Sequence, residues 1–189
     1  IVRCAVPDIQ AAKALLDIVN QVNIPVVADI HFHHQLALEA LKSGVHCLRL
    51  NPGNIRDQSK VESVVREARA RNVPIRIGVN FGSLPPVGSI GVTGGLSRHT
   101  DGVNNLPKLS DAGLGQYTVV DHMVDTALWE IDILEKLDFD LIKISLKAFD
   151  IETTVEAYRR MAELVPYPLH LGITESGTAR TGSVRTSIG

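Results

Sequence analysis

Apolar runs of a few residues recur along the chain, and stretches with helical apolar spacing separate most of them. A strand that is buried on both faces gives such a run, whereas apolar residues three and four positions apart line one face of a helix. The pattern predicts strands at Ile1–Cys4, Val26–His31, Cys47–Asn51, Ile75–Asn80, Leu141–Lys147 and Leu169–Glu175. It predicts helices at Ile9–Val22, His34–Ser43, Gln58–Arg71, Val119–Leu137 and Glu152–Leu164.

Strands that alternate with helices fold as βαβ units around a parallel sheet, so the predicted fold class is α/β. The repeat is typical of a TIM (β/α)8 barrel, where the residues at the carboxyl ends of the strands form the active site. Those strand ends carry Asp, His, Arg, Asn, Lys and Glu in this chain. Such side chains at those positions indicate an enzyme.

About six strand–helix units are visible, where a closed barrel takes eight. The chain begins within a predicted strand and ends where a helix should start. We therefore expect residues 1–189 to be an incomplete barrel from a longer protein. Residues 82–117 form a Gly/Pro/Ser-rich tract, which predicts either a lid over the active site or a disordered insertion.

The composition narrows the classes of function. Of the 189 residues, 44% are hydrophobic and 21% are charged, which is ordinary for a globular protein. A net charge of −2 gives no reason to expect nucleic acid or an anionic membrane as partner. No apolar run approaches the roughly 20 residues that span a bilayer, and no signal peptide is visible. Cys4 and Cys47 both lie in predicted strands, as reduced thiols of a cytoplasmic protein would.

Basic residues fall late in four of the predicted strands: Arg3, Arg49, Arg76 and Lys147. In a barrel they would converge on one mouth, where an anion would relieve their repulsion, and guanidinium groups suit phosphate oxygens. The alternative is that each arginine pairs with a carboxylate such as Asp29 or Glu175. Because the cations outnumber these carboxylates, the pattern favours phosphate or diphosphate as ligand.

A second anion-binding candidate is the loop at 177–183, whose backbone N–H groups and hydroxyls lead into a helix N-terminus. A Gly/Ser/Thr loop alone is a weak signal. Glu175, at the end of its predicted strand, is the best candidate proton donor, because a half-apolar mouth raises a carboxyl pKa. It could instead be the partner of an arginine. Asn51 is placed to contact a ligand, or belongs only to a turn.

The histidines at 31–34 raise the alternative of a metal site. His31 and His33 at a strand end, with Lys147 and His170 on later strands, would suit a metal-dependent hydrolase. His170, however, lies early in its predicted strand, and His34 is placed to cap a helix. We therefore favour His31 as a hydrogen-bonding residue of the active site and expect no metal ligands in this chain.

Four motifs occur in order along the chain, at Ala28–Phe32, Leu48–Asn54, Arg76–Asn80 and Leu169–Glu175. With them the chain resembles the 4-hydroxy-3-methylbut-2-enyl diphosphate synthase family over nearly its whole length except the Gly-rich tract. The family catalyses the penultimate step of the methylerythritol phosphate pathway of isoprenoid (terpenoid) biosynthesis. It opens 2-C-methyl-D-erythritol 2,4-cyclodiphosphate reductively with loss of water, and ferredoxin or flavodoxin supplies the two electrons.

The resemblance implies roles for particular residues of this chain. Asp29, His31 and Glu175 would be the catalytic set, with Glu175 as the acid for the departing hydroxyl. The substrate-binding set would be Arg3, Arg49, Asn51, Arg76, Asn80, Ser145 and Lys147.

The resemblance also implies a TIM barrel followed by a smaller domain that binds a [4Fe–4S] cluster through three Cys and a Glu. That domain and the first and last barrel strands are absent here, so no cluster ligand is expected in this chain. In the family the cluster domain of one subunit caps the barrel of its partner, which implies a homodimer. The compartment would be the cytoplasm, or the plastid stroma in a plant or alga.

Three alternatives remain open at this stage. A pterin-type transferase on a similar barrel would share a phosphate-binding mouth without a cluster. The metal-dependent hydrolase is the second alternative, and a non-enzymatic folding or dimerisation unit is the third. On the favoured interpretation, the chain alone is predicted to lack reductase activity while retaining most of the anion pocket.

Overall fold

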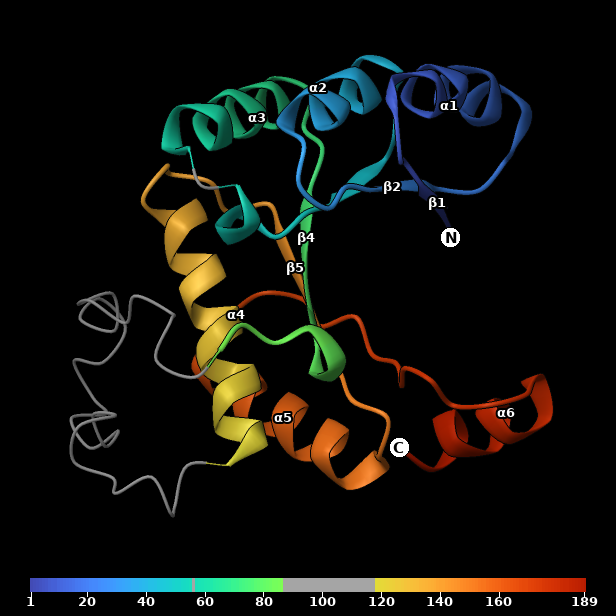
Figure 1. Ribbon diagram of the computed structural model, residues 1–189, viewed down its shortest axis with the longest axis vertical. Helices are drawn as coiled ribbons and strands as arrows, with labels where there is room; N and C mark the ends of the chain where they lie inside the picture. Colours follow the sequence, from blue (N-terminus) through green and yellow to red (C-terminus); the bar gives the residue numbers. More distant parts are fainter. Residues whose placement is uncertain (56, 87–117) are drawn as a thin grey trace. The chain divides into compact units, whose positions relative to one another are not determined.

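The computed structural model describes residues 1–55, 57–86 and 118–189 (Figure 1). From position 87 onward, the tract predicted as a lid or an insertion therefore lies outside the described residues. The described chain forms two compact units, and each is considered by itself. The first unit comprises Ile1–Gly78 and Glu130–Lys143, and the second comprises Val79–Trp129 and Ile144–Gly189.

The strands are β1 (Val2–Ala5), β2 (Val26–Asp29), β3 (Cys47–Arg49), β4 (Ile75–Asn80) and β5 (Ile142–Lys147). They form a five-stranded sheet in the order β1-β2-β3-β4-β5, and the pairs β1–β2, β2–β3 and β3–β4 are parallel. Strands that neighbour each other in chain order with helical crossovers are what a barrel requires. The structure thus confirms the predicted α/β class and these strands, although β2 and β3 end two residues earlier than predicted.

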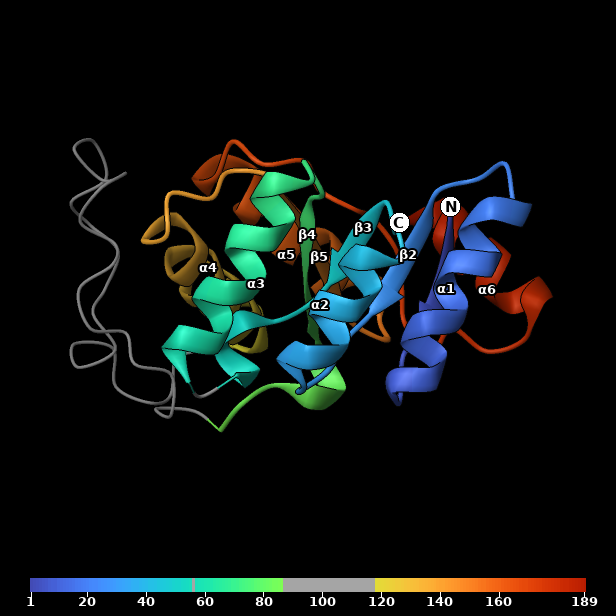
Figure 2. The ribbon, with the colours of Figure 1, turned by 90° about the horizontal axis from the view of Figure 1, so that it is seen from above.

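Three helices cover one face of the sheet in the first unit: α1 (Ile9–Gln21), α2 (His34–Lys42) and α3 (Gln58–Ala70). They lie side by side in both ribbon views (Figures 1 and 2). Two of them begin where an aspartate caps the first turn, because Asp8 accepts from the N–H of Ala11 at 2.8 Å and Asp57 from that of Ser59 at 3.0 Å.

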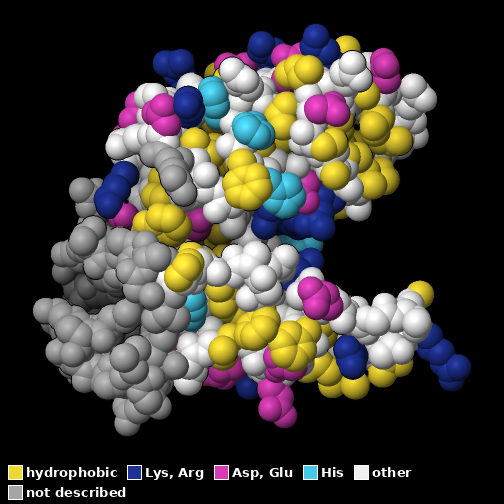
Figure 3. All heavy atoms as spheres, in the orientation of Figure 1, with side chains coloured by type: hydrophobic (Ala, Val, Ile, Leu, Met, Phe, Trp, Pro, Cys, Tyr) yellow, Lys and Arg dark blue, Asp and Glu magenta, His cyan; other side chains and the backbone are white. Residues whose placement is uncertain are grey.

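The register of the strands shows which side chains face these helices. Cys4, Ala28, Leu48 and Ile75 lie in one row across β1 to β4, and the last three of them are fully buried. Apolar residues of the helices complete the core, among them Leu15, Leu41 and Val64. The outer surface of the three helices carries Lys and Arg side chains interspersed with Asp and Glu (Figure 3).

The second unit is built around the later helices, the first part of α4 (Val119–Glu135), α5 (Ile151–Leu164) and α6 (Ala179–Ile188). Asp150 caps α5 by accepting from the N–H of Thr153 at 2.7 Å. The ring of Phe81 meets that of Phe149 edge-on, with centroids 5.0 Å apart.

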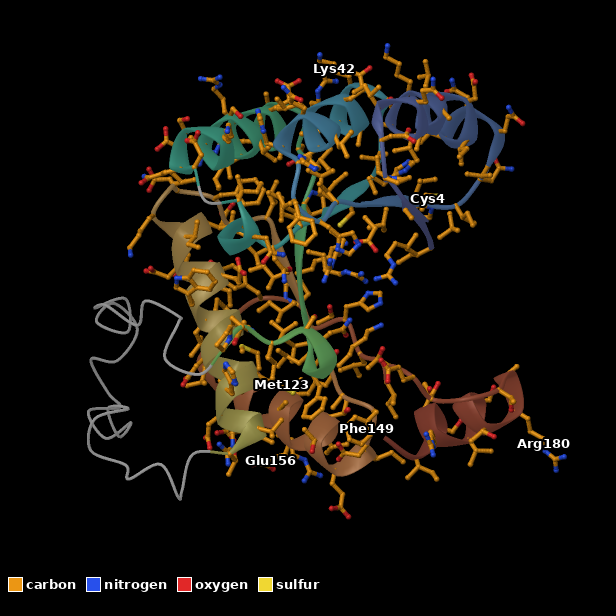
Figure 4. The ribbon with its side chains drawn as sticks, viewed as in Figure 1. Cys4, Lys42, Met123, Phe149, Glu156 and Arg180 are labelled. Carbon is orange, nitrogen blue, oxygen red and sulfur yellow. The ribbon has the colours of Figure 1, made fainter. Side chains whose placement is uncertain are left out.

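Helix α6 corrects the predicted loop at 177–183. The loop ends at Thr178, whose hydroxyl caps a helix that begins at Ala179. The apolar pattern could not predict this helix, because none of its residues is buried and Val184 and Ile188 are more than half exposed. Its first-turn side chain Arg180 points away from the unit (Figure 4).

The sixth predicted strand, Leu169–Glu175, is reduced to a single parallel bridge between Ile144 and Leu169. A tyrosine explains why the ladder stops there. The hydroxyl of Tyr158 accepts from the N–H of Leu146 at 3.1 Å and donates to the carbonyl of His170. These two backbone groups would bond each other in a continuous parallel ladder. The buried tyrosine therefore separates β5 from the segment that follows Leu169.

Within the described ranges, no helix is long and apolar enough to cross a membrane.

Candidate anion-binding site

The face of the sheet opposite the helices carries the predicted polar residues of the first unit. The register places Ala5, Asp29, Arg49 and Arg76 in one row across β1 to β4. Arg3, two residues before Ala5, has its side chain on the same face because strand side chains alternate. Ala5 is exposed, whereas Asp29, Arg49 and Arg76 are buried, with 5 to 8% of each residue exposed.

Asp29 is the centre of this cluster. One of its carboxylate oxygens lies 3.4 Å from Nε of Arg3, and the other lies 3.4 Å from Nη1 of Arg49. His31 approaches the same group, with its Nε2 3.8 Å from Asp29 and its Nδ1 3.3 Å from Nη1 of Arg49. The alternative that the arginines pair with a carboxylate is thus correct for Arg3 and Arg49, which share a single one.

Arg76 is different from the other two arginines. Its Nε is buried and has no hydrogen-bond partner among the described residues. Burial, together with the neighbouring charges of Arg3 and Arg49, lowers the pKa of Arg76. A buried guanidinium donor is costly to leave unpaired, and like charges add to that cost. Three guanidinium groups near one carboxylate, with a buried donor that has no partner among the described residues, form a site that an anion would complete.

The position of Arg49 depends on Gly78 at the end of the first unit's β4 segment. Nη2 of Arg49 donates to the carbonyl of Gly78 at 2.8 Å. A Cβ at this glycine would lie 2.6 Å from Nε of Arg49, closer than real Cβ contacts allow. Only glycine therefore lets the guanidinium lie against the backbone here.

Asn51 bonds the same glycine. Its Nδ2 donates to the Gly78 carbonyl at 3.0 Å, and its Oδ1 accepts from the Gly78 N–H at 2.9 Å. Asn51 is followed by the 3-10 turn Pro52–Asn54 (η1). Asn51 therefore precedes a turn, and its side chain also fixes Gly78, against which Arg49 lies. That Asn51 contacts a ligand stays a prediction.

Glu130 is a residue that the sequence reasoning did not single out. It lies on α4, is 2% exposed, and its Oε2 accepts from the N–H of Gly53 at 2.6 Å. Burial raises the pKa of Glu130 to about 7, against the effects of the Gly53 N–H and of Arg49. A signal was present in the sequence, because Glu130 stands three residues after Ala127 and four before Leu134 on the buried stripe of α4.

The remaining predicted residues belong to the second unit. Ser145 and Lys147 share one face of β5, and Ser145 is buried. A Cβ at Gly172 would lie 3.0 Å from Nζ of Lys147, so this ammonium also rests over a glycine. Asn80 ends β4, and Glu175 is exposed with a φ of 51°. That these residues join the arginine cluster in one site stays a prediction.

The other histidines do not extend the cluster. His33 is the N-cap of α2 without a side-chain cap bond, and His34 is the first residue of that helix, which corrects its predicted capping role. Both line an open groove of about 390 Å³ with Phe32, Asp57 and Lys60. In the part of the chain that the structure describes, no three His, Cys, Asp or Glu side chains are grouped so as to hold a metal ion.

The cysteines do not fit the ligand set of an iron–sulfur cluster. The chain has only two, Cys4 and Cys47. Cys4 lies in the row that faces the helices, whereas Cys47 lies in a row with Val27 and Arg3. Cluster ligands are thiolates, and burial raises the pKa of the Cys47 thiol. No step of a reaction is therefore assigned to a cluster held by this chain.

A parallel α/β sheet with helical crossovers and polar side chains at its strand ends is the architecture of the TIM-barrel class. The sequence model described as "GcpE TIM-barrel domain" matches residues 1–189. The chain belongs to this family. The match also confirms the predicted TIM-barrel class and the family resemblance.

Two relatives of this chain share a name. A protein of Dehalococcoides mccartyi is 50% identical over 189 residues, which are 100% of this chain and 47% of that protein. A protein of Bacillus cytotoxicus is 48% identical over 189 residues, or 45% of its own length. Both are named "4-hydroxy-3-methylbut-2-en-1-yl diphosphate synthase (flavodoxin)". The chain thus spans about half the length of these relatives.

A solved structure, a putative phosphonomutase from Burkholderia cenocepacia, aligns with a TM-score of 0.46 at 12% identity. The alignment covers 95% of this chain and 66% of that chain, and a likeness this distant has no bearing on the site.

Proposed function

We propose that this chain is the substrate-binding barrel part of a 4-hydroxy-3-methylbut-2-en-1-yl diphosphate synthase. The whole enzyme would open 2-C-methyl-D-erythritol 2,4-cyclodiphosphate reductively with loss of water. The observation that carries the proposal is the buried Nε of Arg76, which lies near Arg3 and Arg49 and has no hydrogen-bond partner in the described part of the chain. Diphosphate oxygens would accept from this donor and offset the excess positive charge.

The residues of this chain would act by binding and orienting the substrate. Arg3, Arg49 and Arg76 would hold the diphosphate, and Asp29 would fix the directions of the first two guanidinium groups. A substrate fixed at its diphosphate presents its carbon skeleton in one orientation, which is catalysis by positioning. Asn80, Ser145 and Lys147 would complete the binding set, and Glu175 would supply the proton for the departing hydroxyl.

The redox part of the reaction would come from outside this chain. Two cysteines are too few for a cluster held by three Cys and a Glu. We propose that the [4Fe–4S] cluster is bound by a further domain of the whole protein and that it supplies the two electrons at the substrate. The relatives' name supports flavodoxin as donor. A homodimer and a cytoplasmic location belong to the same proposal.

Titration calorimetry with the cyclic diphosphate tests the binding step. The 189-residue chain should bind it, and Arg76→Ala should weaken binding at least about 100-fold, the loss expected for a buried charged contact. Lys42→Ala is the matched control, because Lys42 projects from the outer side of α2 (Figure 4) and pairs with Glu39 of the same helix at 3.6 Å. Absence of binding by the unaltered chain, or equal binding by Arg76→Ala, would contradict the proposal.

A further inference from the structure

A chain of hydrogen bonds in the first unit connects helix α4 to the arginine cluster. It begins at Glu130, whose Oε2 accepts from the N–H of Gly53 at 2.6 Å. Gly53 lies in the 3-10 turn Pro52–Asn54, where the first N–H groups have no partner within the turn itself. The side-chain oxygen of Glu130 supplies the missing acceptor.

Asn51 connects this turn to Gly78 by hydrogen bonds. The carbonyl of Asn51 accepts from the N–H of Asn54 at 3.0 Å, so a hydrogen bond joins Asn51 to the turn. The Asn51 side chain then bonds both the N–H and the carbonyl of Gly78. Arg49 donates to the same carbonyl at 2.8 Å. Displacement of the turn would therefore move the group against which Arg49 is seated.

We propose that Glu130 is a positioning residue for the anion-binding site, which holds the 51–54 turn and thereby fixes Asn51, Gly78 and the guanidinium of Arg49. The inference deepens the proposed function and rests on it for the identity of the ligand. A buried carboxylate on an apolar helix face is costly unless it is hydrogen-bonded. The hydrogen bond from the Gly53 N–H offsets part of that cost.

Two substitutions separate positioning from general stability. Glu130→Gln keeps an oxygen that can accept from Gly53, whereas Glu130→Ala removes the acceptor from this half-buried N–H. Thr126→Val is the matched control one turn earlier in α4, because it removes a buried hydroxyl that donates to the carbonyl of His122 at 2.7 Å. It should destabilise the same helix without touching the turn.

The first measurement is amide hydrogen exchange at Gly78, whose N–H is protected by Asn51. Glu130→Ala should speed this exchange at least about tenfold, the effect of weakening one hydrogen bond. Glu130→Gln and Thr126→Val should leave the exchange of Gly78 within about threefold of the unaltered chain. Unchanged exchange at Gly78 in Glu130→Ala would overturn the inference, whatever the ligand.

The second measurement is the Kd of the chain for the cyclic diphosphate. We expect Glu130→Ala to raise it at least about tenfold while Glu130→Gln restores it to near the unaltered value. Equal weakening by Thr126→Val would mean a merely structural role and would overturn the inference. If the unaltered chain binds no diphosphate while Gly78 exchange responds as expected, the proposed function fails, and the assignment of Glu130 to a diphosphate site fails with it.

Discussion

Arg49 lies directly against Gly78, so closely that a Cβ at residue 78 would meet Nε of Arg49 at 2.6 Å. Gly78→Ala should therefore displace the guanidinium and its bond to the Gly78 carbonyl. We expect the Kd for the cyclic diphosphate to rise at least about tenfold in titration calorimetry. Gly82→Ala is the control, since a Cβ there has only an ordinary contact at 3.9 Å. Binding by Gly78→Ala that matches the control would contradict this interpretation.

Arg76→Met should stabilise the fold while it abolishes binding. The substitution removes a buried unpaired donor and a charge that neighbours Arg3 and Arg49. The free energy of unfolding in urea should rise by about 1–3 kcal/mol. Arg3→Met is the comparison, because Arg3 is paired with Asp29 and its side chain is 52% exposed. A drop in stability for Arg76→Met would show that an unseen partner satisfies this arginine.

Glu130 should make the stability of the fold depend on pH. Its pKa is about 7 in the folded chain and 4.5 ordinarily, so between these values the folded state holds a proton that the unfolded state has released. The free energy of unfolding should then fall by about 3 kcal/mol as the pH rises from 4.5 to 7, and level off above 7.

Glu130→Gln removes this titration, so the variant should lose less stability over the same pH range. Urea unfolding at several pH values compares the two proteins, and other titrating groups cancel in the difference. The variant should equal the unaltered chain near pH 4.5 and exceed it above pH 7. Parallel pH profiles would contradict the prediction.

Tyr158→Phe should destabilise the second unit. The hydroxyl is the partner of both the Leu146 N–H and the His170 carbonyl, and a buried backbone group without a partner costs about 1–3 kcal/mol. We expect a loss of this size in urea unfolding and faster amide exchange at Leu146. The N–H of His170, which donates to Ile144 at 2.7 Å, is an internal reference. If Leu146 stays as protected as before, the tyrosine does not hold this junction.

Much of the fold follows from the sequence because apolar periodicity reports burial. Leu48 and Ile75 mark strands buried on both faces, and Leu15 marks a helix packed on the sheet. Apolar periodicity does not predict α6, because no residue of that helix is buried. It wrongly predicts a full strand at Leu169–Glu175, because Tyr158 interrupts the ladder of hydrogen bonds there. A side chain that lies between two backbone segments in this way results from tertiary packing, and no local sequence pattern predicts it.

The candidate site was predictable in its composition and less so in its pairings. Positions late in adjacent strands predicted that Arg3, Asp29, Arg49 and Arg76 would gather. Asp29 lies against two arginines, while Nε of Arg76 has no partner among the described residues; this pairing depends on rotamers, which the sequence does not specify. The role of Glu130 was not predicted because Glu130 and its partner Gly53 lie 77 positions apart in the sequence.

The sharing of Asp29 by two guanidinium groups has a consequence for the kinetics of capture. Long basic side chains ordinarily lose rotational freedom when they bind a ligand, which costs about 0.5–1.5 kcal/mol of binding free energy for each side chain. Arg3 and Arg49 are already restrained by one carboxylate before any anion arrives. A diphosphate would thus bind to two arginines that are already oriented. Its association rate should therefore depend on diffusion and salt concentration rather than on slow rearrangement of the arginines.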